Sequence, residues 1–192
     1  MVQKWLQKTV LALMIAISIV QAESIPNPCE LLTHQEVEQL MGIPMKEGRL
    51  KDSKNQFVGL VCSHFSVSLF DQSGSIELII DTTQSMKETD SIYASAKDHY
   101  DRQKNAYIKA QKDQNKLDTF QQVEGFGDDA YWNHVSLIIL YKDTYLDIHV
   151  NAGTGITGKN KEEVQKKVEE KNLAVSKEAA TLILKQLNIK PE

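Results

Sequence analysis

The sequence has few of the residues that mark a catalytic, metal-binding or nucleic-acid-binding protein. Its 192 residues include only two cysteines and no Cys-x-x-Cys pair. No two histidines have the i, i+4 spacing of a helical zinc site, and the Gly-x-Ser-x-Gly motif of serine hydrolases is missing. We therefore predict no metal, no cofactor and no catalytic residue, although an enzyme with an unfamiliar site stays open.

The sequence also has no excess of basic over acidic residues. The formal net charge is -4, and loss of Lys4 and Lys8 with the N-terminal segment would make it -6. Nucleic acids and anionic membranes attract basic surfaces, so a mildly acidic chain is a poor candidate for either partner.

One long apolar run is present, close to the N-terminus. Two lysines precede an uncharged apolar stretch over residues 9–20, and Ala22 follows it. This pattern is typical of a secretory signal, and the stretch is shorter than the roughly 20 residues needed to span a bilayer. We predict a signal peptide over residues 1–22 and a single domain over 23–192, periplasmic or secreted, with no stable membrane anchor. An uncleaved N-terminal anchor is the alternative.

The two cysteines are Cys29 and Cys62. In an oxidising compartment an isolated pair most simply forms one disulfide bond, which we predict. Closing a loop of this length would stabilise the fold by ~2–4 kcal/mol. Two reduced thiols are the alternative.

Hydrophobic periodicity and capping residues predict helices and strands in a regular order. The expected elements are a helix from Thr33 to Gly42, a loop over 46–56, strands over 57–70 and 76–81, a long helix from Ser85 to about Gln114, a strand from Ala130, a hairpin of 135–141 with 144–151, a helix from Asn160 to about Lys171, and a last helix capped by Ser176. Residues 135–140 are apolar on both faces and should form a central strand. This order favours an α+β fold with a single antiparallel sheet of about five strands and helices packed mainly on one face.

A family resemblance rests on two motifs and the cysteine pair. The motifs are Pro28-Cys29-Glu30-Leu31-Leu32-Thr33 and Val123-Glu124-Gly125-Phe126-Gly127-Asp128-Asp129-Ala130-Tyr131-Trp132. The chain resembles secreted bacterial domains of unknown function that are common among actinobacterial lipoproteins. It is similar to the extracytoplasmic sensor domain of a mycobacterial serine/threonine kinase of the PknH type. The resemblance implies a non-catalytic α+β domain with a groove for an unidentified ligand.

The second motif supplies the candidate ligand groove. Its expected residues are Gly125, Phe126, Gly127, Asp128, Tyr131 and Trp132, with the last two as an aromatic wall. The alternative is a purely structural turn, in which the glycines take positive φ and Asp128 hydrogen-bonds to nearby backbone amides.

The favoured function is a non-enzymatic exported domain that binds a small ligand or a protein partner. One alternative is a hydrolase or transferase with a site near His64, Asp147 and His149, which we expect on similar sheet faces.

A second alternative is an accessory or inhibitor-like protein that acts through the long helix. Its face would present Tyr93, Tyr100 and Tyr107, which recur every seven residues. The other interpretation of this tyrosine stripe is that it packs into the core, since tyrosine buries its ring and keeps its hydroxyl wet.

Overall fold

The computed structural model describes residues 26–55, 58–68, 73–114, 120–152 and 155–188. The predicted signal peptide, residues 1–22, lies outside the described residues.

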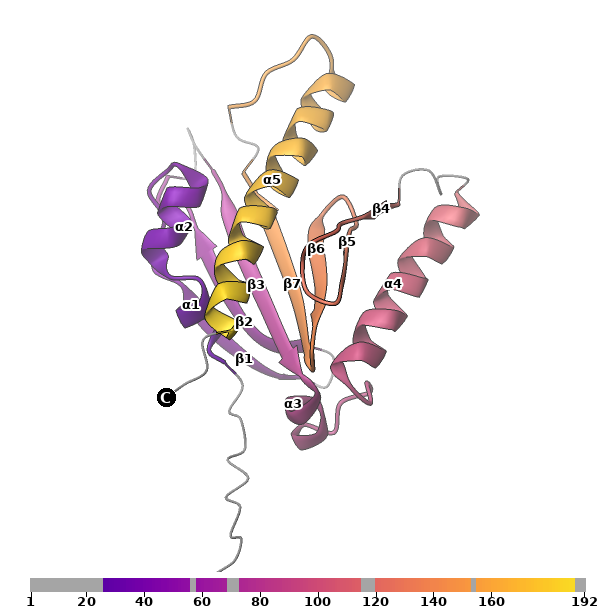
Figure 1. Ribbon diagram of the computed structural model, residues 1–192. Coiled ribbons are helices and arrows are strands. Elements are labelled where there is room, and N and C mark those ends of the chain that lie inside the picture. Colours follow the sequence, from indigo (N-terminus) through magenta and orange to yellow (C-terminus); the bar gives the residue numbers. More distant parts are fainter. Residues whose placement is uncertain (1–25, 56–57, 69–72, 115–119, 153–154, 189–192) are drawn as a thin grey trace, which may run out of the picture.

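One antiparallel sheet forms the middle of the molecule (Figure 1), with seven strands in the order β1-β2-β3-β7-β6-β5-β4. The strands are β1 (Arg49–Asn55), β2 (Val58–Phe65), β3 (Ser75–Thr82), β4 (Gln121–Gln122), β5 (Asp129–Trp132), β6 (Ser136–Tyr141) and β7 (Thr144–Asn151). The predicted α+β class and single antiparallel sheet are confirmed, but the number of strands was underestimated. The two missed strands, β1 and β4, are polar edge strands, and β1 occupies most of the predicted loop.

The second hairpin lies at the centre of the sheet, as predicted. β7 is the fourth of the seven strands and pairs with β3 on one side and β6 on the other. The turn between β6 and β7 is Lys142-Asp143, where Lys142 has a φ of 51°. We call face A the side that carries Leu78, Leu146 and Ile148, and face B the side that carries Glu77, Tyr145 and Asp147.

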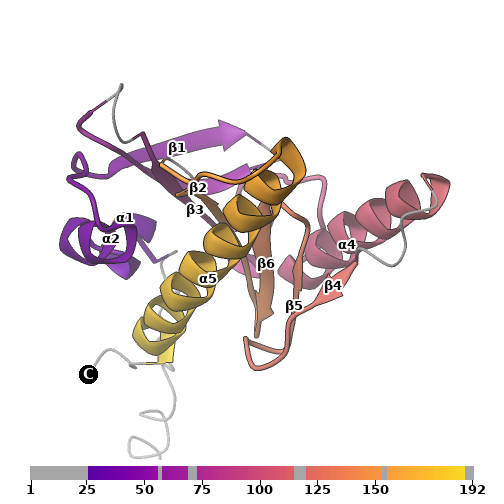
Figure 2. The ribbon, with the colours of Figure 1, turned by 90° about the horizontal axis from the view of Figure 1, so that it is seen from above.

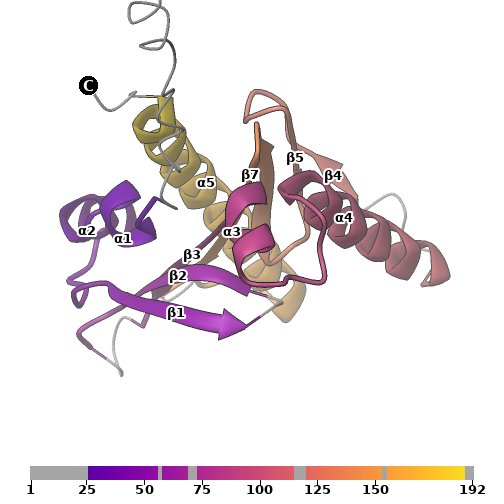
Figure 3. The same cartoon turned by 90° about the horizontal axis from the view of Figure 1, so that it is seen from below.

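Helices cover both faces of this sheet (Figure 2). They are α1 (Pro28–Leu31), α2 (His34–Met41), α3 (Thr83–Glu88), α4 (Ala96–Asp113) and α5 (Lys161–Asn188). α1, α2 and α5 pack on face A, where the larger apolar core lies. α4 packs on face B, over β6 and β7 (Figure 3). Met86 of α3 belongs to the same face-B cluster, so the prediction that helices lie mainly on one face holds for three of the five helices and fails for α3 and α4.

The predicted long helix from Ser85 is two helices. Thr82, not Ser85, caps the first one, and the side chains of Thr82 and Ser85 form a capping box. α3 ends at Glu88, and the chain turns through Asp90, which has a φ of 49°. Ser95 then caps α4 by accepting a hydrogen bond from the Asp98 amide at 3.1 Å.

The two predicted C-terminal helices are instead one helix, α5. Asn160 caps it as expected, with its side-chain oxygen 2.8 Å from the Glu163 amide nitrogen. Ser176 lies in the middle of α5 and is fully buried, and its hydroxyl has no hydrogen-bond partner. The expected break before Ser176 is therefore wrong, because packing on the sheet carries the helix through it.

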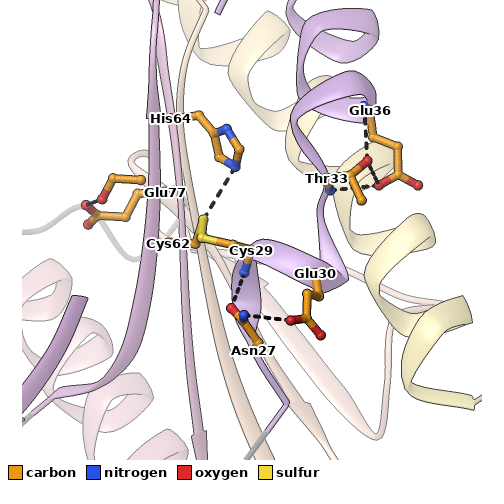
Figure 4. The surroundings of a disulfide bond; sticks show 9 residues. Asn27, Cys29, Glu30, Thr33, Glu36, Cys62, His64 and Glu77 are labelled. Atoms are coloured by element: carbon orange, nitrogen blue, oxygen red, sulfur yellow. Dashed lines mark hydrogen bonds between the residues drawn. A yellow bond between two sulfur atoms is a disulfide. The ribbon is translucent and has the colours of Figure 1, made fainter. Parts of the chain in front are cut away.

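The N-terminal segment is fixed to the sheet by the predicted disulfide bond. Cys29 in α1 bonds Cys62 in β2, with an S–S distance of 2.01 Å (Figure 4). α2 follows directly, with the predicted capping box between Thr33 and Glu36 and with Gly42 in the left-handed conformation at its end. Among the described helices, none combines the length and apolar character needed to cross a bilayer.

Candidate functional site

A pocket of about 380 Å³ lies between the loop before β5 and the last turns of α5. Its lining consists of Gly125, Phe126, Gly127, Asp128, Tyr141, Thr181, Leu184, Lys185 and Asn188. The structure thus places the first four residues of the predicted groove around one hollow. The α5 residues were not predicted, because nothing in the sequence shows which loop the last helix meets.

The loop lies directly against the β6–β7 hairpin. Gly125 and Gly127 have φ values of 84° and 63°, and a Cβ atom on Gly127 would collide with the carbonyl oxygen of Leu140. The Asp128 amide donates to that same oxygen at 2.8 Å. The Asp128 carboxylate accepts a hydrogen bond from the Lys142 amide at 2.6 Å, so the predicted structural role of Asp128 is confirmed.

Most polar groups of the pocket are already paired within the protein. The Tyr141 hydroxyl donates to the side-chain oxygen of Asn188, and the Thr181 hydroxyl donates to the Lys177 carbonyl at 2.9 Å. Lys185 makes no ion pair with any described residue. Among the described side chains of the pocket, the donors that bind no other described residue are the Lys185 ammonium and the Asn188 amide, which lie next to an apolar wall of half-buried Phe126 and Leu184.

Tyr131 and Trp132 do not line the pocket, which corrects the predicted aromatic wall. Each is 1% exposed. Tyr131 points to face B, under α4, and Trp132 points to face A, because successive strand residues face opposite sides. Both positions are buried because helices cover both faces of the sheet at β5.

A second group of polar residues crosses face B. The strand register aligns Ser63, Glu77, His149 and Ser136 across β2, β3, β7 and β6. The Ser63 hydroxyl donates to Glu77 at 2.7 Å. Figure 4 shows Glu77 on the side of the sheet opposite the disulfide.

Asp147 lies on the same face, in the next row of the sheet. Burial raises its pKa to about 6, while a hydrogen bond from Ser136 and the charge of His149 oppose the rise. Glu77 adds to the rise through charge repulsion. The Oδ1 atom of Asp147 is buried and has no hydrogen-bond partner, although the residue as a whole keeps some contact with solvent.

His64 is not part of this group, which corrects the expectation that it shares a face with Asp147 and His149. Pairing of His64 with Ile76 places it on face A, where it is 2% exposed. Its Nε2 lies 3.4 Å from Cys62 Sγ (Figure 4), and burial lowers its pKa. His64 and Cys62 are two residues apart in one strand, a spacing that could have shown that they share a face.

The three tyrosines of the proposed partner-binding helix pack into the protein. Tyr100 is fully buried and meets Tyr131 edge-on at 5.6 Å between ring centroids, and the Tyr107 ring lies 6.0 Å from the same residue. Tyr93 precedes α4 and stacks on His99 at 3.8 Å. His99 in turn stacks on Tyr145 at 3.9 Å. This stripe therefore forms the core of face B and does not present a free surface.

No set of three or more His, Cys, Asp or Glu side chains suited to a metal ion occurs in the described part of the chain. Comparisons with known proteins give no match to a family model, to a curated protein or to a solved structure. The resemblance to actinobacterial lipoproteins and to the PknH-type sensor domain therefore stays a prediction.

Proposed function

We propose that this protein is a non-enzymatic domain, exported to the periplasm or secreted, that binds a small ligand in the pocket between residues 125–128 and α5. The observation that carries the proposal is the pocket itself. The N-terminal signal pattern and the disulfide support export, since such bonds persist in oxidising compartments.

The chemistry of the pocket favours a ligand with a carboxylate and an apolar body. The Lys185 ammonium and the Asn188 side-chain amide are hydrogen-bond donors, and Lys185 also carries positive charge. The ligand should therefore supply an anionic acceptor. Phe126 and Leu184 would contact its apolar part. The Asp128 carboxylate should repel an anionic ligand less than an unpaired carboxylate would, because it accepts a hydrogen bond from the Lys142 amide.

Phenylacetate is a suitable probe, with phenylacetamide as its neutral isostere. In amide NMR spectra, phenylacetate should shift the signals of Gly125, Gly127 and Thr181. Lys185→Gln should weaken its binding by roughly 10- to 100-fold, since a hydrogen bond to a charged group contributes ~1.5–3 kcal/mol.

Lys171→Gln is the matched control, because Lys171 is an exposed lysine of α5 that does not line the pocket. The proposal fails if phenylacetate leaves the three amide signals unchanged, or if phenylacetamide binds equally well.

A further inference from the structure

The two halves of the disulfide bond differ in their surroundings. Cys29 lies in α1 and keeps partial exposure, whereas Cys62 lies in β2 and is 1% exposed. A thiol from solvent therefore approaches the bond from the Cys29 side, while Cys62 faces the interior. In thiol–disulfide exchange one sulfur is attacked and the other leaves, and access decides which. The difference in exposure makes Cys29 the attacked sulfur and Cys62 the leaving one.

A histidine ring contacts the sulfur of the buried cysteine. His64 Nε2 lies 3.4 Å from Cys62 Sγ, and Figure 4 shows the ring pointing at the disulfide. A sulfur atom within a disulfide carries no hydrogen, so a hydrogen bond between these two atoms requires Nε2 to be the donor. The ring is thus placed to stabilise negative charge on Cys62 when the S–S bond breaks.

Gly48, the residue before β1, closes over this contact. A Cβ atom on Gly48 would lie 2.7 Å from Cys62 Sγ and 2.7 Å from His64 Nε2. A side chain at this position would force the ring, the sulfur or the backbone to move. The direct contact between the ring and the sulfur therefore depends on a glycine at position 48.

The preferred charge of His64 depends on the state of the disulfide. With the bond intact, burial lowers the pKa of His64, and the nearby His34 adds to the fall. Hydrogen bonds to backbone carbonyls and the charge of Glu47 oppose the fall, so these groups favour a protonated ring. A thiolate at Cys62 would add a negative charge in direct contact with the ring, and such a charge raises the pKa of a histidine.

We propose that Cys29, Cys62 and His64 form a thiol-exchange site, at which a small thiol becomes attached to Cys29. The thiolate of the small molecule attacks Cys29 Sγ and forms a new S–S bond there. The bond between the two cysteines breaks, and its electron pair leaves with Cys62 Sγ as a thiolate, which accepts a hydrogen bond from His64 Nε2. The exchange removes the covalent link between α1 and the sheet. This site is separate from the pocket beside α5 and does not depend on the function proposed for that pocket.

Glutathione is the probe for the attacked sulfur. The folded, oxidised protein is incubated with excess glutathione, quenched with acid and mapped by peptide mass spectrometry. Glutathione should be found on Cys29, with Cys62 as the free thiol. Glutathione on Cys62, an equal distribution over both cysteines, or no reaction with the folded protein would overturn the proposal.

The rate of the same reaction tests the role of the ring. His64→Phe keeps a ring of similar size and removes the donor, and it should slow the reaction by about tenfold, since a thiol of higher pKa is a slower leaving group. His134→Phe is the matched control, at a partly exposed histidine that contacts Glu169 of α5, and should leave the rate unchanged. A rate that His64→Phe leaves unchanged or increases would overturn the role of the ring.

A titration of Cys62 keeps the proposal testable if His64→Phe does not fold. Cys29→Ala leaves Cys62 as a single free cysteine beside an intact His64, and thermal unfolding verifies the fold of this variant. The ultraviolet absorbance of the thiolate, followed against pH, should give a pKa for Cys62 well below the ordinary value of ~8.5. Burial alone would raise the pKa of this thiol, so a value at or above the ordinary one would show that His64 does not stabilise the thiolate.

Discussion

At the scale of single residues, Asp147 is the most unusual group in the protein. It lies in the central strand and is largely desolvated, and one of its carboxylate oxygens is unpaired. A charge in such a position costs stability unless a partner compensates for it.

The raised pKa of Asp147 predicts a pH-dependent stability. Its folded value of about 6 exceeds the ordinary value of 3.8, so the folded state holds this proton more tightly than the unfolded chain. The stabilising contribution is fully present below pH ~4 and is lost as the pH rises through ~6. Asp147→Asn mimics the neutral acid at every pH. It should raise the free energy of unfolding at pH 8 by about 1–2 kcal/mol, allowing for partial solvent contact, and should change little near pH 4.

Urea denaturation of both proteins at pH 4 and pH 8 measures this difference. Glu178→Gln, at an exposed carboxylate of α5, serves as the control and should show no such pH-dependent gain. A loss of stability in Asp147→Asn at pH 8 would mean that the charged carboxylate has a favourable partner in the folded protein.

At the scale of elements, α5 shows how tertiary packing overrides a local signal. Ser176 was interpreted as an N-cap, and its residue type favours that role. In the structure its hydroxyl is buried in the middle of the helix, next to the buried residues Val175, Ala179 and Ala180. Burial of that apolar stripe against the sheet outweighs the preference of serine for a helix end.

Ser176→Ala separates the two interpretations by the sign of its effect. In the middle of a helix, the change removes an unpaired buried hydroxyl and improves helix propensity, so the free energy of unfolding should rise by about 0.5–1.5 kcal/mol. At an N-cap it should fall by about 0.5–2 kcal/mol. Chemical denaturation monitored by circular dichroism measures the difference, and Asn160→Ala, at the observed cap, should show the loss.

At the scale of the whole molecule, the disulfide joins the N-terminal helices to the sheet. The bond closes a loop with a sequence separation of 33 residues. Replacing both Cys29 and Cys62 by alanine should lower the free energy of unfolding by about 2–4 kcal/mol, because the unfolded chain regains the entropy that the cross-link removes. Urea denaturation under non-reducing conditions measures this loss.

The single variants provide the control. Either substitution alone breaks the bond, so Cys29→Ala and Cys62→Ala should each cost about as much as the double substitution. If the losses from the two single substitutions instead sum to the loss from the double substitution, the cysteines stabilise the fold by separate packing and not by their cross-link.

Local chemistry by itself determined the starts and ends of several elements, the central hairpin and the pairing of the cysteines. Thr33 with Glu36, Gly42, and the Lys142-Asp143 turn act through neighbours in the chain, and their roles can be predicted from residue type and spacing. Only two cysteines are present, so only one intramolecular pairing was possible.

Only the tertiary structure decided which face of the sheet each helix covers and therefore which residues meet. It placed His64 on face A and Asp147 with His149 on face B, sent Tyr131 and Trp132 into the core, and brought Lys185 to the loop at Gly125. The physical reason is that these placements depend on strand register and on contacts between segments far apart in the chain. A shift of one residue in register moves every side chain of a strand to the other face, and periodicity within one segment does not specify its neighbours.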